Sequence, residues 1–332
     1  MKAMLSHSPG GPDTLKLETL PDPTPKKGEA IIDVKACGVN FPDFLIIQDK
    51  YQFKPARPFA PGGEVAGTIS AIGEGVTNVK IGDRVLASAG WGGMADKFVV
   101  EAWRCQKIPD SMPFDVASAL LLTYGTSQHA LKDRAKLKAG ETLLVLGAAG
   151  GVGLAAVELG KAYGARVVGA VSTQEKADFV KSRGADDCIV YLTGPFDKDG
   201  AKVLADLFKK ASGKDGANVI YDAVGGDYSE ASLRAIAWEG RFLVVGFPAG
   251  IAKLPLNLAL LKGCDILGIF WGDWVRRFPQ KHQTNVNELM ELYAAGKISP
   301  HVSETFPLEK SGDAIAWLAS RKAMGKVVVT VD

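Results

Sequence analysis

The fold of this chain is decided by the stretch Thr142-Leu143-Leu144-Val145-Leu146-Gly147-Ala148-Ala149-Gly150-Gly151-Val152-Gly153. Its first part is an uninterrupted apolar run, typical of a buried strand, and its second part is rich in glycine. Apolar residues then recur at helical spacing up to Tyr163, Gly164 is suited to end a helix, and another apolar run covers residues 165–171. Strand, glycine turn, helix and strand within about 30 residues predict a βαβ unit with a dinucleotide-binding turn.

The turn has the pattern Ala148-x-Gly150-x-x-Gly153, with alanine in the first glycine place. Glycine is needed because a dinucleotide pyrophosphate must approach the backbone N–H groups at the helix N-terminus, and a Cβ atom would hold it off. The turn also explains the uncharged stretch between Glu141 and Glu158, which is shorter than the ~20 residues of a membrane-spanning helix. The residues expected at the pyrophosphate are Ala149, Gly150, Gly151 and Val152.

The end of the second strand indicates which dinucleotide binds. A site for NAD presents Asp or Glu to the ribose 2′-hydroxyl about 20 residues beyond the turn, but this chain has Ser172-Thr173-Gln174-Glu175-Lys176 there. A 2′-phosphate could accept hydrogen bonds from Ser172 and Thr173 and pair with Lys176, which favours NADPH. The alternative is that Ser172 only caps the next helix and Lys176 is a solvated charge. Tyr191, ending the next strand, lies beside the adenosine or is a packing residue.

The sequence pattern changes between Leu122 and Thr123. Up to Leu122, short β-type runs broken by Gly and Pro predict a compact, mostly antiparallel β domain. From Thr123 onward, strand-like runs alternate with helical stretches, which predicts a doubly wound α/β domain with a parallel sheet. After Trp271 two amphipathic helical stretches and a last strand remain, and we expect this tail to pack on the β domain. The strand-end residues expected beside the nicotinamide half of a cofactor are Val224, Gly246 and Phe247.

Composition and charge exclude several classes of protein. The 332 residues are 47% hydrophobic and 23% charged, which suits two domains at about 150 residues each. The formal net charge is +2 without a long run of one sign, so nucleic acid is not an expected partner. Four dispersed cysteines and four histidines argue against a disulfide framework and a structural zinc cluster. No signal-peptide segment develops before Pro9, so we expect a cytoplasmic protein with no membrane partner.

Five segments carry a family resemblance: Cys37-Gly38-Val39-Asn40-Phe41-Pro42-Asp43, Pro61-Gly62-Gly63-Glu64-Val65-Ala66-Gly67, Val79-Lys80-Ile81-Gly82-Asp83-Arg84-Val85, Ala148 to Gly153, and Gly325-Lys326-Val327-Val328. Over nearly its whole length the chain resembles the medium-chain dehydrogenase/reductase superfamily, and within it the zinc-independent quinone oxidoreductases related to zeta-crystallin. The resemblance implies an α/β protein with a GroES-like, mostly-β catalytic domain at residues 1–122 and 272–332. It implies a doubly wound Rossmann NADPH-binding domain at residues 123–271.

The resemblance also bears on metal binding. The superfamily's zinc alcohol dehydrogenases hold a catalytic zinc with a Cys that would fall at Asn40 and a His that would fall at Gly63. Neither an Asn amide nor Gly supplies a thiolate, imidazole or carboxylate ligand, so we expect no metal site. Without a Lewis acid, hydride transfer from NADPH to a quinone or similar α,β-unsaturated carbonyl is favoured over reduction of a simple ketone.

Two hydrogen-bond donors are the candidate catalytic residues. Asn40 can donate from its amide without titrating, and the Tyr51 hydroxyl is protonated at neutral pH and can bond a developing oxyanion. Both match polar active-site positions of the quinone oxidoreductases, although a further tyrosine of some members is Leu45 here. Alternatively, Asn40 is a turn residue and Tyr51 a surface aromatic. The resemblance also implies a structural role for Asp43 and cofactor contacts for Thr126, Phe270 and Lys326.

Two other functions stay open at this level. An enoyl-CoA or acryloyl-CoA reductase would need a basic patch for the CoA phosphates, which Arg276, Arg277 and Lys281 could form as well as they could form a plain surface helix. A non-catalytic, crystallin-like NADPH-binding protein is the alternative from another class. The resemblance further implies a homodimer joined at edge strands, for which the apolar run at residues 266–271 is the candidate.

Overall fold

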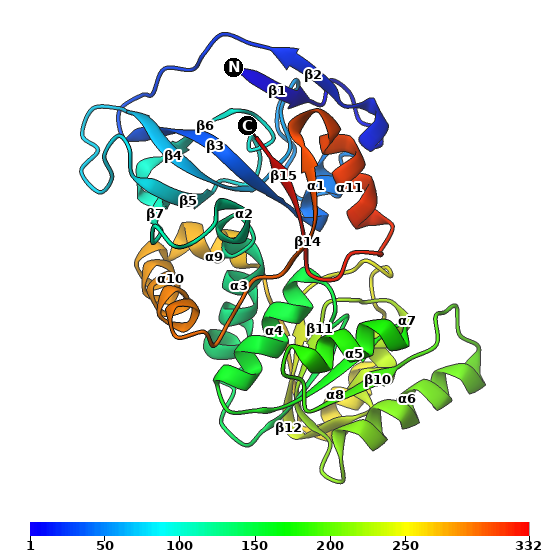
Figure 1. Cartoon of the computed structure of the whole chain (residues 1–332). Helices are drawn as coiled ribbons and strands as arrows, with labels where there is room; N and C mark the ends of the chain where they lie inside the picture. The colour runs from blue at the N-terminus through cyan, green and yellow to red at the C-terminus, as the bar shows by residue number, and fades with distance from the viewer. Residues whose placement is uncertain (332) are drawn as a thin grey trace. The chain divides into compact units, whose positions relative to one another are not determined.

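The computed structural model describes residues 1–331, which form two compact units (Figure 1). One unit contains Met1–Leu122 together with the chain from Pro300 onward, and the other contains Thr123–Ser299. The first unit is mostly β and the second alternates strands and helices, so the predicted α/β fold class is confirmed.

The first unit is built on a mostly antiparallel sheet. Its strands are β1 (Lys2–Leu5), β2 (Lys16–Thr19), β3 (Glu29–Val39), β4 (Glu64–Ile72), β5 (Arg84–Ser88), β6 (Lys97–Glu101), β7 (Gln106–Lys107), β14 (Val302–Pro307) and β15 (Lys326–Thr330). β1 and β2 form a hairpin-like pair, and the larger sheet has the order β14-β15-β3-β4-β5-β7 with β6 also paired to β3. Among the described strands of this sheet, β14 and β15 pair in parallel and the other pairs are antiparallel. β3 is central because three strands pair with it, and its apolar residues enter the core of this unit.

Short helices complete the first unit. They are η1 (Pro12–Thr14), α1 (Phe41–Ile46), η2 (Ala102–Arg104), α2 (Phe114–Ala117), η4 (Leu308–Lys310) and α11 (Ser311–Ala319). The segment from Pro300 onward packs on this unit, because Leu308, Ile315 and Val329 belong to the same buried core as the strands of the N-terminal part.

The second unit is a doubly wound parallel sheet of order β10-β9-β8-β11-β12-β13. The strands are β8 (Thr142–Leu146), β9 (Arg166–Val171), β10 (Asp187–Val190), β11 (Ala217–Asp222), β12 (Ile236–Val244) and β13 (Asp265–Gly268). The helices are α3 (Leu121–Gln128), the π-helix η3 (His129–Arg134), α4 (Gly151–Ala162), α5 (Gln174–Ser182), α6 (Lys198–Ser212), α7 (Asp227–Leu233), α8 (Leu256–Lys262), α9 (Trp271–Arg277) and α10 (Pro279–Ala294).

Alternation along the buried strands separates the two helical layers of this unit, because successive strand side chains point to opposite faces. Leu144 and Val168 share a buried cluster with Phe208 of α6. On the other face, Leu143 lies against α4 at Gly160, where a Cβ atom would be only 2.7 Å from the Leu143 side chain. A continuous apolar run such as 143–146 therefore reflects a strand covered on both sides.

The structure places one segment differently from the prediction. We expected residues 272–332 to belong to the catalytic domain, but the chain up to Ser299, including α9 and α10, belongs to the second unit. The His129 ring stacks on Trp274 of α9 at 4.3 Å, and Asn285 of α10 donates to Asp133 at 2.9 Å. An amphipathic pattern shows that one face of a helix is buried, but it does not show which unit that face packs against. The sequence therefore did not reveal that α9 and α10 belong to the second unit.

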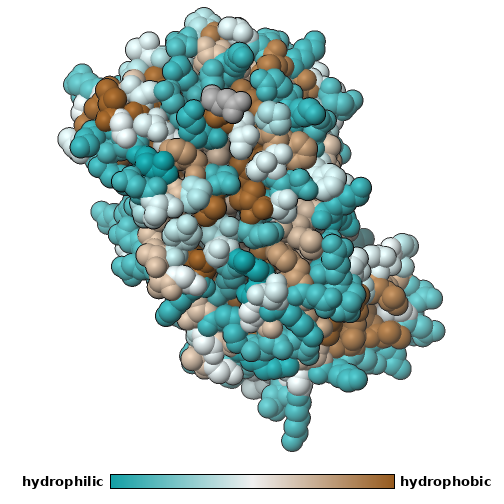
Figure 2. Space-filling model, viewed as in Figure 1, coloured by the Kyte–Doolittle hydropathy of each residue, from teal (hydrophilic) through white to brown (hydrophobic). Residues whose placement is uncertain are grey.

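The molecular surface seen in Figure 2 is mostly hydrophilic with scattered hydrophobic patches. Several large apolar side chains are exposed along and before α8, among them Ile251, Leu256, Leu260 and Leu261. Within residues 1–331, no helix combines the length and the apolar character that crossing a membrane requires.

Candidate active site

The glycine turn after β8 has the geometry of a phosphate cradle. Gly147 has φ +69°, in the left-handed region that favours glycine. At Gly153 a Cβ atom would lie 2.1 Å from the carbonyl oxygen of Gly147, so this glycine allows α4 to pack closely on the turn. At Gly150 a Cβ atom would meet only that same oxygen, at 3.5 Å. The space above Gly150, at the N-terminus of α4, is thus open to a ligand.

Alanine in the first glycine place is compatible with this geometry. Ala148 is fully buried, and its N–H donates to Ala170 O of the neighbouring strand at 3.3 Å. The first backbone N–H groups of α4 have no acceptor within the helix. α3 is fixed to this turn because the Ser127 hydroxyl donates to Val152 O at 2.8 Å, and the half-buried Thr126 precedes that serine.

The polar residues expected at a 2′-phosphate follow β9. Thr173, not Ser172, caps α5: its hydroxyl oxygen accepts from Lys176 N at 3.2 Å. Ser172 and Lys176 are half-buried. Tyr191 lies beside this strand end, since its N–H donates to Val171 O at 2.9 Å, and its ring is 7% exposed and packs on Tyr228 with centroids 5.0 Å apart. The structure therefore brings these residues to one edge of the sheet, with Tyr191 largely buried.

The other strand-end residues reach the same edge. The register pairs Asp222 with both Leu146 and Val244, and Val244 with Gly268, so the strands end together. Asp222 is buried and fixes the turn by accepting bonds from Val224 N, Gly225 N and the Ser229 hydroxyl. Burial raises the pKa of Asp222 above its usual value. Beyond these strands, Phe247 and Phe270 are each nearly half exposed, and a Cβ atom at Gly246 would make only ordinary contacts, with Ala223 O at 3.7 Å and Pro248 Cδ at 3.8 Å.

Asn40, a candidate catalytic residue of the first unit, lies in a buried polar network with Glu64 and Lys326. Its amide nitrogen donates to Glu64 Oε1 at 2.9 Å and to Gly38 O at 3.1 Å, and its amide oxygen accepts from Lys326 Nζ at 2.6 Å. Lys326 also bonds Glu64 Oε1 at 2.5 Å. Both amide hydrogens of Asn40 are engaged, so a substrate carbonyl would have to take one of them from its present acceptor.

Asp43, in the first turn of α1, supports this network. Its carboxylate accepts from Asn40 N at 2.7 Å and from Gly62 N at 2.9 Å, and the residue is 1% exposed. Burial raises the pKa of Asp43 from 3.8 to about 6, against the lowering effect of those two hydrogen bonds and of the nearby Lys326 charge. These contacts are those of a residue with a structural role.

Tyr51 offers a different kind of donor. It follows α1, is half-buried and packs edge-on against Phe53 with ring centroids 5.9 Å apart. Burial, and next the Asp43 charge, raise the pKa of Tyr51 above 10, so its hydroxyl is protonated at neutral pH. No residue among 1–331 forms a hydrogen bond with that hydroxyl. The Tyr51 proton is therefore available to an acceptor, unlike those of the Asn40 amide.

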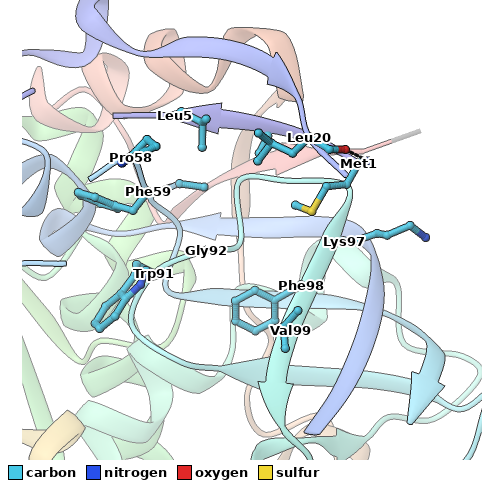
Figure 3. Close-up of a pocket in the computed structure, with 12 residues that line it drawn as sticks. Met1, Leu5, Leu20, Pro58, Phe59, Trp91, Gly92, Lys97, Phe98 and Val99 are labelled. Atoms are coloured by element: carbon cyan, nitrogen blue, oxygen red, sulfur yellow. Dashed lines mark hydrogen bonds between the residues drawn. The ribbon is translucent and has the colours of Figure 1, made fainter. Parts of the chain in front are cut away.

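One cavity of about 320 Å³ lies in the first unit, beside β1 and β6 (Figure 3). Its lining is mainly apolar and includes Leu5, Phe59, Trp91 and Phe98, and it contains none of the predicted site residues. Lys97 at its edge is already bonded to Asp33 at 2.9 Å. The cavity thus offers no free charged group for ligand recognition.

Comparison with known proteins identifies the family. Residues 26–110 match the family described as alcohol dehydrogenase GroES-like domain, and residues 151–291 match the family described as zinc-binding dehydrogenase. A quinone oxidoreductase-like protein 2 homolog of Nematostella vectensis is 41% identical over 302 residues, which are 90% of this chain and 80% of the relative. The chain belongs to the quinone oxidoreductase-like family of medium-chain dehydrogenases/reductases.

Further relatives of this quinone oxidoreductase-like chain agree. Human quinone oxidoreductase is 32% identical over 316 residues, covering 95% of this chain and 92% of the human protein. The crystal structure of Escherichia coli quinone oxidoreductase complexed with NADPH superposes with a TM-score of 0.90 at 28% identity, covering 99% of this chain and all of the other. The predicted family is therefore confirmed, and this chain is an oxidoreductase.

The two positions at which zinc-dependent relatives carry metal ligands are occupied differently in this quinone oxidoreductase-like chain. Asn40 is bonded in the polar network described above, and at Gly63 a Cβ atom would lie 3.2 Å from Gly90 O. No three His, Cys, Asp or Glu side chains within the described part, residues 1–331, are grouped so that they could hold a metal ion.

Sequence reasoning did not single out two buried carboxylates of this quinone oxidoreductase-like chain. Glu64 lies in the Asn40 network, and Glu158 lies on α4 and is 5% exposed. Both carry the same signal in the sequence, a single charge within a run of small and apolar residues. A charged side chain at such a position is buried only when it is paired or hydrogen-bonded. The pattern therefore predicts an ion pair, but it does not identify the residue that pairs with the carboxylate.

Proposed function

We propose that this chain transfers hydride from NADPH to a quinone or a similar α,β-unsaturated carbonyl, without a metal. The observation that carries the proposal is the open space above Gly150 at the N-terminus of α4, together with a strand end after β9 that presents hydroxyl groups and a lysine instead of a carboxylate. The NADPH bound in the Escherichia coli relative supports the same cofactor.

The residues present fit NADPH. The pyrophosphate would be held by backbone N–H groups at Ala149, Gly150, Gly151 and Val152. Ser172, Thr173 and Lys176 would hold the 2′-phosphate, because a phosphate accepts bonds from hydroxyl groups and pairs with an ammonium. When bound, NADPH supplies the hydride, and the residues of the chain only position the acceptor.

Tyr51 is the residue that we propose to bond the acceptor oxygen. As hydride reaches the conjugated carbon, negative charge develops on the carbonyl oxygen, and a preorganised O–H donor stabilises it. Asn40 would contribute the hydrogen that it now donates to Gly38 O, the longer of its two bonds. Water supplies the proton that completes the reduction, so no metal or further titrating group is required.

The test is steady-state oxidation of NADPH with 1,4-quinones compared with acryloyl-CoA and crotonyl-CoA. We expect turnover with the quinones, and a Tyr51→Phe variant should lower kcat roughly tenfold or more because it loses an oxyanion donor. Tyr293→Phe, on the half-buried face of α10, is the control and should not change kcat. A preference for the CoA esters, or unchanged kcat in Tyr51→Phe, would contradict the proposal.

The contacts of α9 weigh against a CoA ester. Arg276 and Arg277 both pair with Asp273, at 2.7 Å and 2.5 Å, which partly neutralises the basic patch that CoA phosphates would need. Lys281 lies over the Phe278 ring at 5.1 Å. For a non-catalytic NADPH-binding protein, the distinguishing result is protection against thermal unfolding by NADPH with no turnover of any acceptor.

A homodimer is part of the proposal. β13 is an edge strand of its sheet, and an uncovered edge strand pairs readily with another chain. In the stretch of chain that precedes β13, Ile251 is 81% and Leu260 of α8 is 81% exposed, which suits burial against a second copy.

A further inference from the structure

Within residues 1–331 the chain passes between its two units at two points, after Leu122 and after Ser299. The first crossing falls in the first turn of α3, and the second falls in the segment without helix or strand that follows α10. A residue next to each crossing bonds to the same carboxylate oxygen, Glu158 Oε2 of α4. Tyr124 Oη donates to it at 2.8 Å, and Ser299 N donates to it at 2.8 Å.

Arg183 completes the cluster. Its Nε donates to Glu158 Oε1 at 3.0 Å, and its Nη2 donates both to Glu158 Oε1 and to Ser299 O. The N–H and the carbonyl of Ser299 are therefore both held, one by the carboxylate and one by the guanidinium. Ser299 lies outside regular structure, and its position is thereby fixed by a side chain of α4 and by one at the end of α5.

Burial makes these bonds strong. Glu158 is 5% and Tyr124 is 2% exposed, and a buried carboxylate is tolerated only when it is paired and hydrogen-bonded. Burial, and next the Glu158 charge, raise the pKa of Tyr124 well above 10, so its phenol stays protonated and donates. The four donors thus satisfy Glu158 only while both crossings are in place.

Glu158 also links the crossings to the cofactor turn. It lies two turns along α4 from Gly151, about 10 Å from the helix N-terminus at 1.5 Å per residue. α4 therefore carries the pyrophosphate cradle at one end and the attachment of both crossings in its middle. If a ligand bound at the N-terminus of α4 stabilises the helix, it also stabilises the hydrogen bonds that hold the two crossings. By thermodynamic linkage, those hydrogen bonds then increase the affinity for the ligand by the same factor.

We propose that Glu158 is a positioning residue that anchors both chain crossings to α4, so that order at the two crossings is coupled to dinucleotide binding at the glycine turn. The coupling rests on NADPH as the proposed cofactor, whereas the anchoring itself does not. Both the anchoring and the coupling can be tested without measuring the turnover of an acceptor.

The experiment is hydrogen–deuterium exchange of the full chain, followed in peptides that contain residues 119–126 and 296–302, with and without NADPH. In Glu158→Gln, the amides of both peptides should exchange about tenfold faster or more, because hydrogen bonds to a charged group are lost at both places. NADPH should protect both peptides in the wild type and much less in the variant. The Kd for NADPH, measured by calorimetry, should rise in Glu158→Gln, because the attachment of the crossings and the binding of the ligand are coupled.

Glu141→Gln is the matched control, because Glu141 forms a half-buried ion pair with Arg241 at 2.6 Å in the same unit, away from both crossings. It should leave the two peptides unchanged. Arg183→Lys is the milder variant if Glu158→Gln does not fold, and it should speed exchange near Ser299 but not near Tyr124.

The anchoring is overturned if Glu158→Gln speeds exchange at neither crossing or at only one, or if Glu141→Gln has an equal effect. The coupling is overturned if NADPH binds but leaves both peptides unprotected in the wild type. If NADPH does not bind at all, the proposed function fails, while the exchange result without NADPH still decides the anchoring.

Discussion

Replacing two glycines of the same turn by alanine should separate binding from folding. At Gly150 the added Cβ atom fits, since its only neighbour is 3.5 Å away and φ is −81°, which alanine adopts readily. At Gly153 the added atom would be 2.1 Å from Gly147 O, so α4 must move by about 1.3 Å to reach an ordinary 3.4 Å contact. The methyl group added at Gly150 would occupy the space proposed for the ligand. The methyl group added at Gly153 would instead clash with the backbone of the turn.

The magnitudes follow from these distances. Gly150→Ala should cost about 1 kcal/mol or less as a change at a helix N-cap, but should raise the Kd for NADPH at least about tenfold by obstructing the backbone N–H groups. Gly153→Ala should lose about 3 kcal/mol to overpacking and regain about 1 kcal/mol in helix propensity. The net loss of about 2 kcal/mol should lower Tm by about 5 °C.

The assays are thermal unfolding by circular dichroism and NADPH titration by calorimetry. Gly160→Ala in the same helix is the control, because its Cβ would meet the side chains of Leu143 at 2.7 Å and Val167 at 2.9 Å, far from the turn. It should lower Tm without a specific loss of affinity. An unchanged Kd in Gly150→Ala would refute the placement of the pyrophosphate, and an unchanged Tm in Gly153→Ala would refute the close packing of α4.

Three further results are expected. Lys176→Glu should raise the KM for NADPH much more than that for NADH, whereas Lys181→Glu on the same helix should not; equal changes would place the phosphate pocket elsewhere. Because the pKa of Asp43 is about 6 in the fold and near 3.8 in the unfolded chain, the fold holds this proton more tightly. Relative to Asp43→Asn, wild-type stability in denaturant titrations should therefore fall by up to about 3 kcal/mol between pH 4 and pH 7, and a parallel pH profile would contradict this. Leu260→Lys should yield monomers in sedimentation analysis while Val203→Lys, also exposed, does not; dimers in both would mean another interface.

Local patterns in the sequence predicted much of this fold. The run from Thr142 to Gly153 predicted β8, the turn and α4, because strand burial, the glycine turn and helical spacing are all properties of neighbouring residues. The alternation beyond Thr123 predicted the parallel sheet for the same reason. The strand end after β9 also kept its predicted polar residues, although Thr173 rather than Ser172 caps the helix.

The sequence by itself therefore determined the βαβ unit, the location of the glycine turn and the family, all of which depend on short-range order. Only the tertiary structure decided that Lys326 bonds Asn40 across 286 positions of the sequence and that Tyr124 and Ser299 share Glu158. It also decided that α9 and α10 belong with the second unit. A buried charge or an apolar stripe requires a partner, but the partner is selected by three-dimensional packing, which no local spacing encodes.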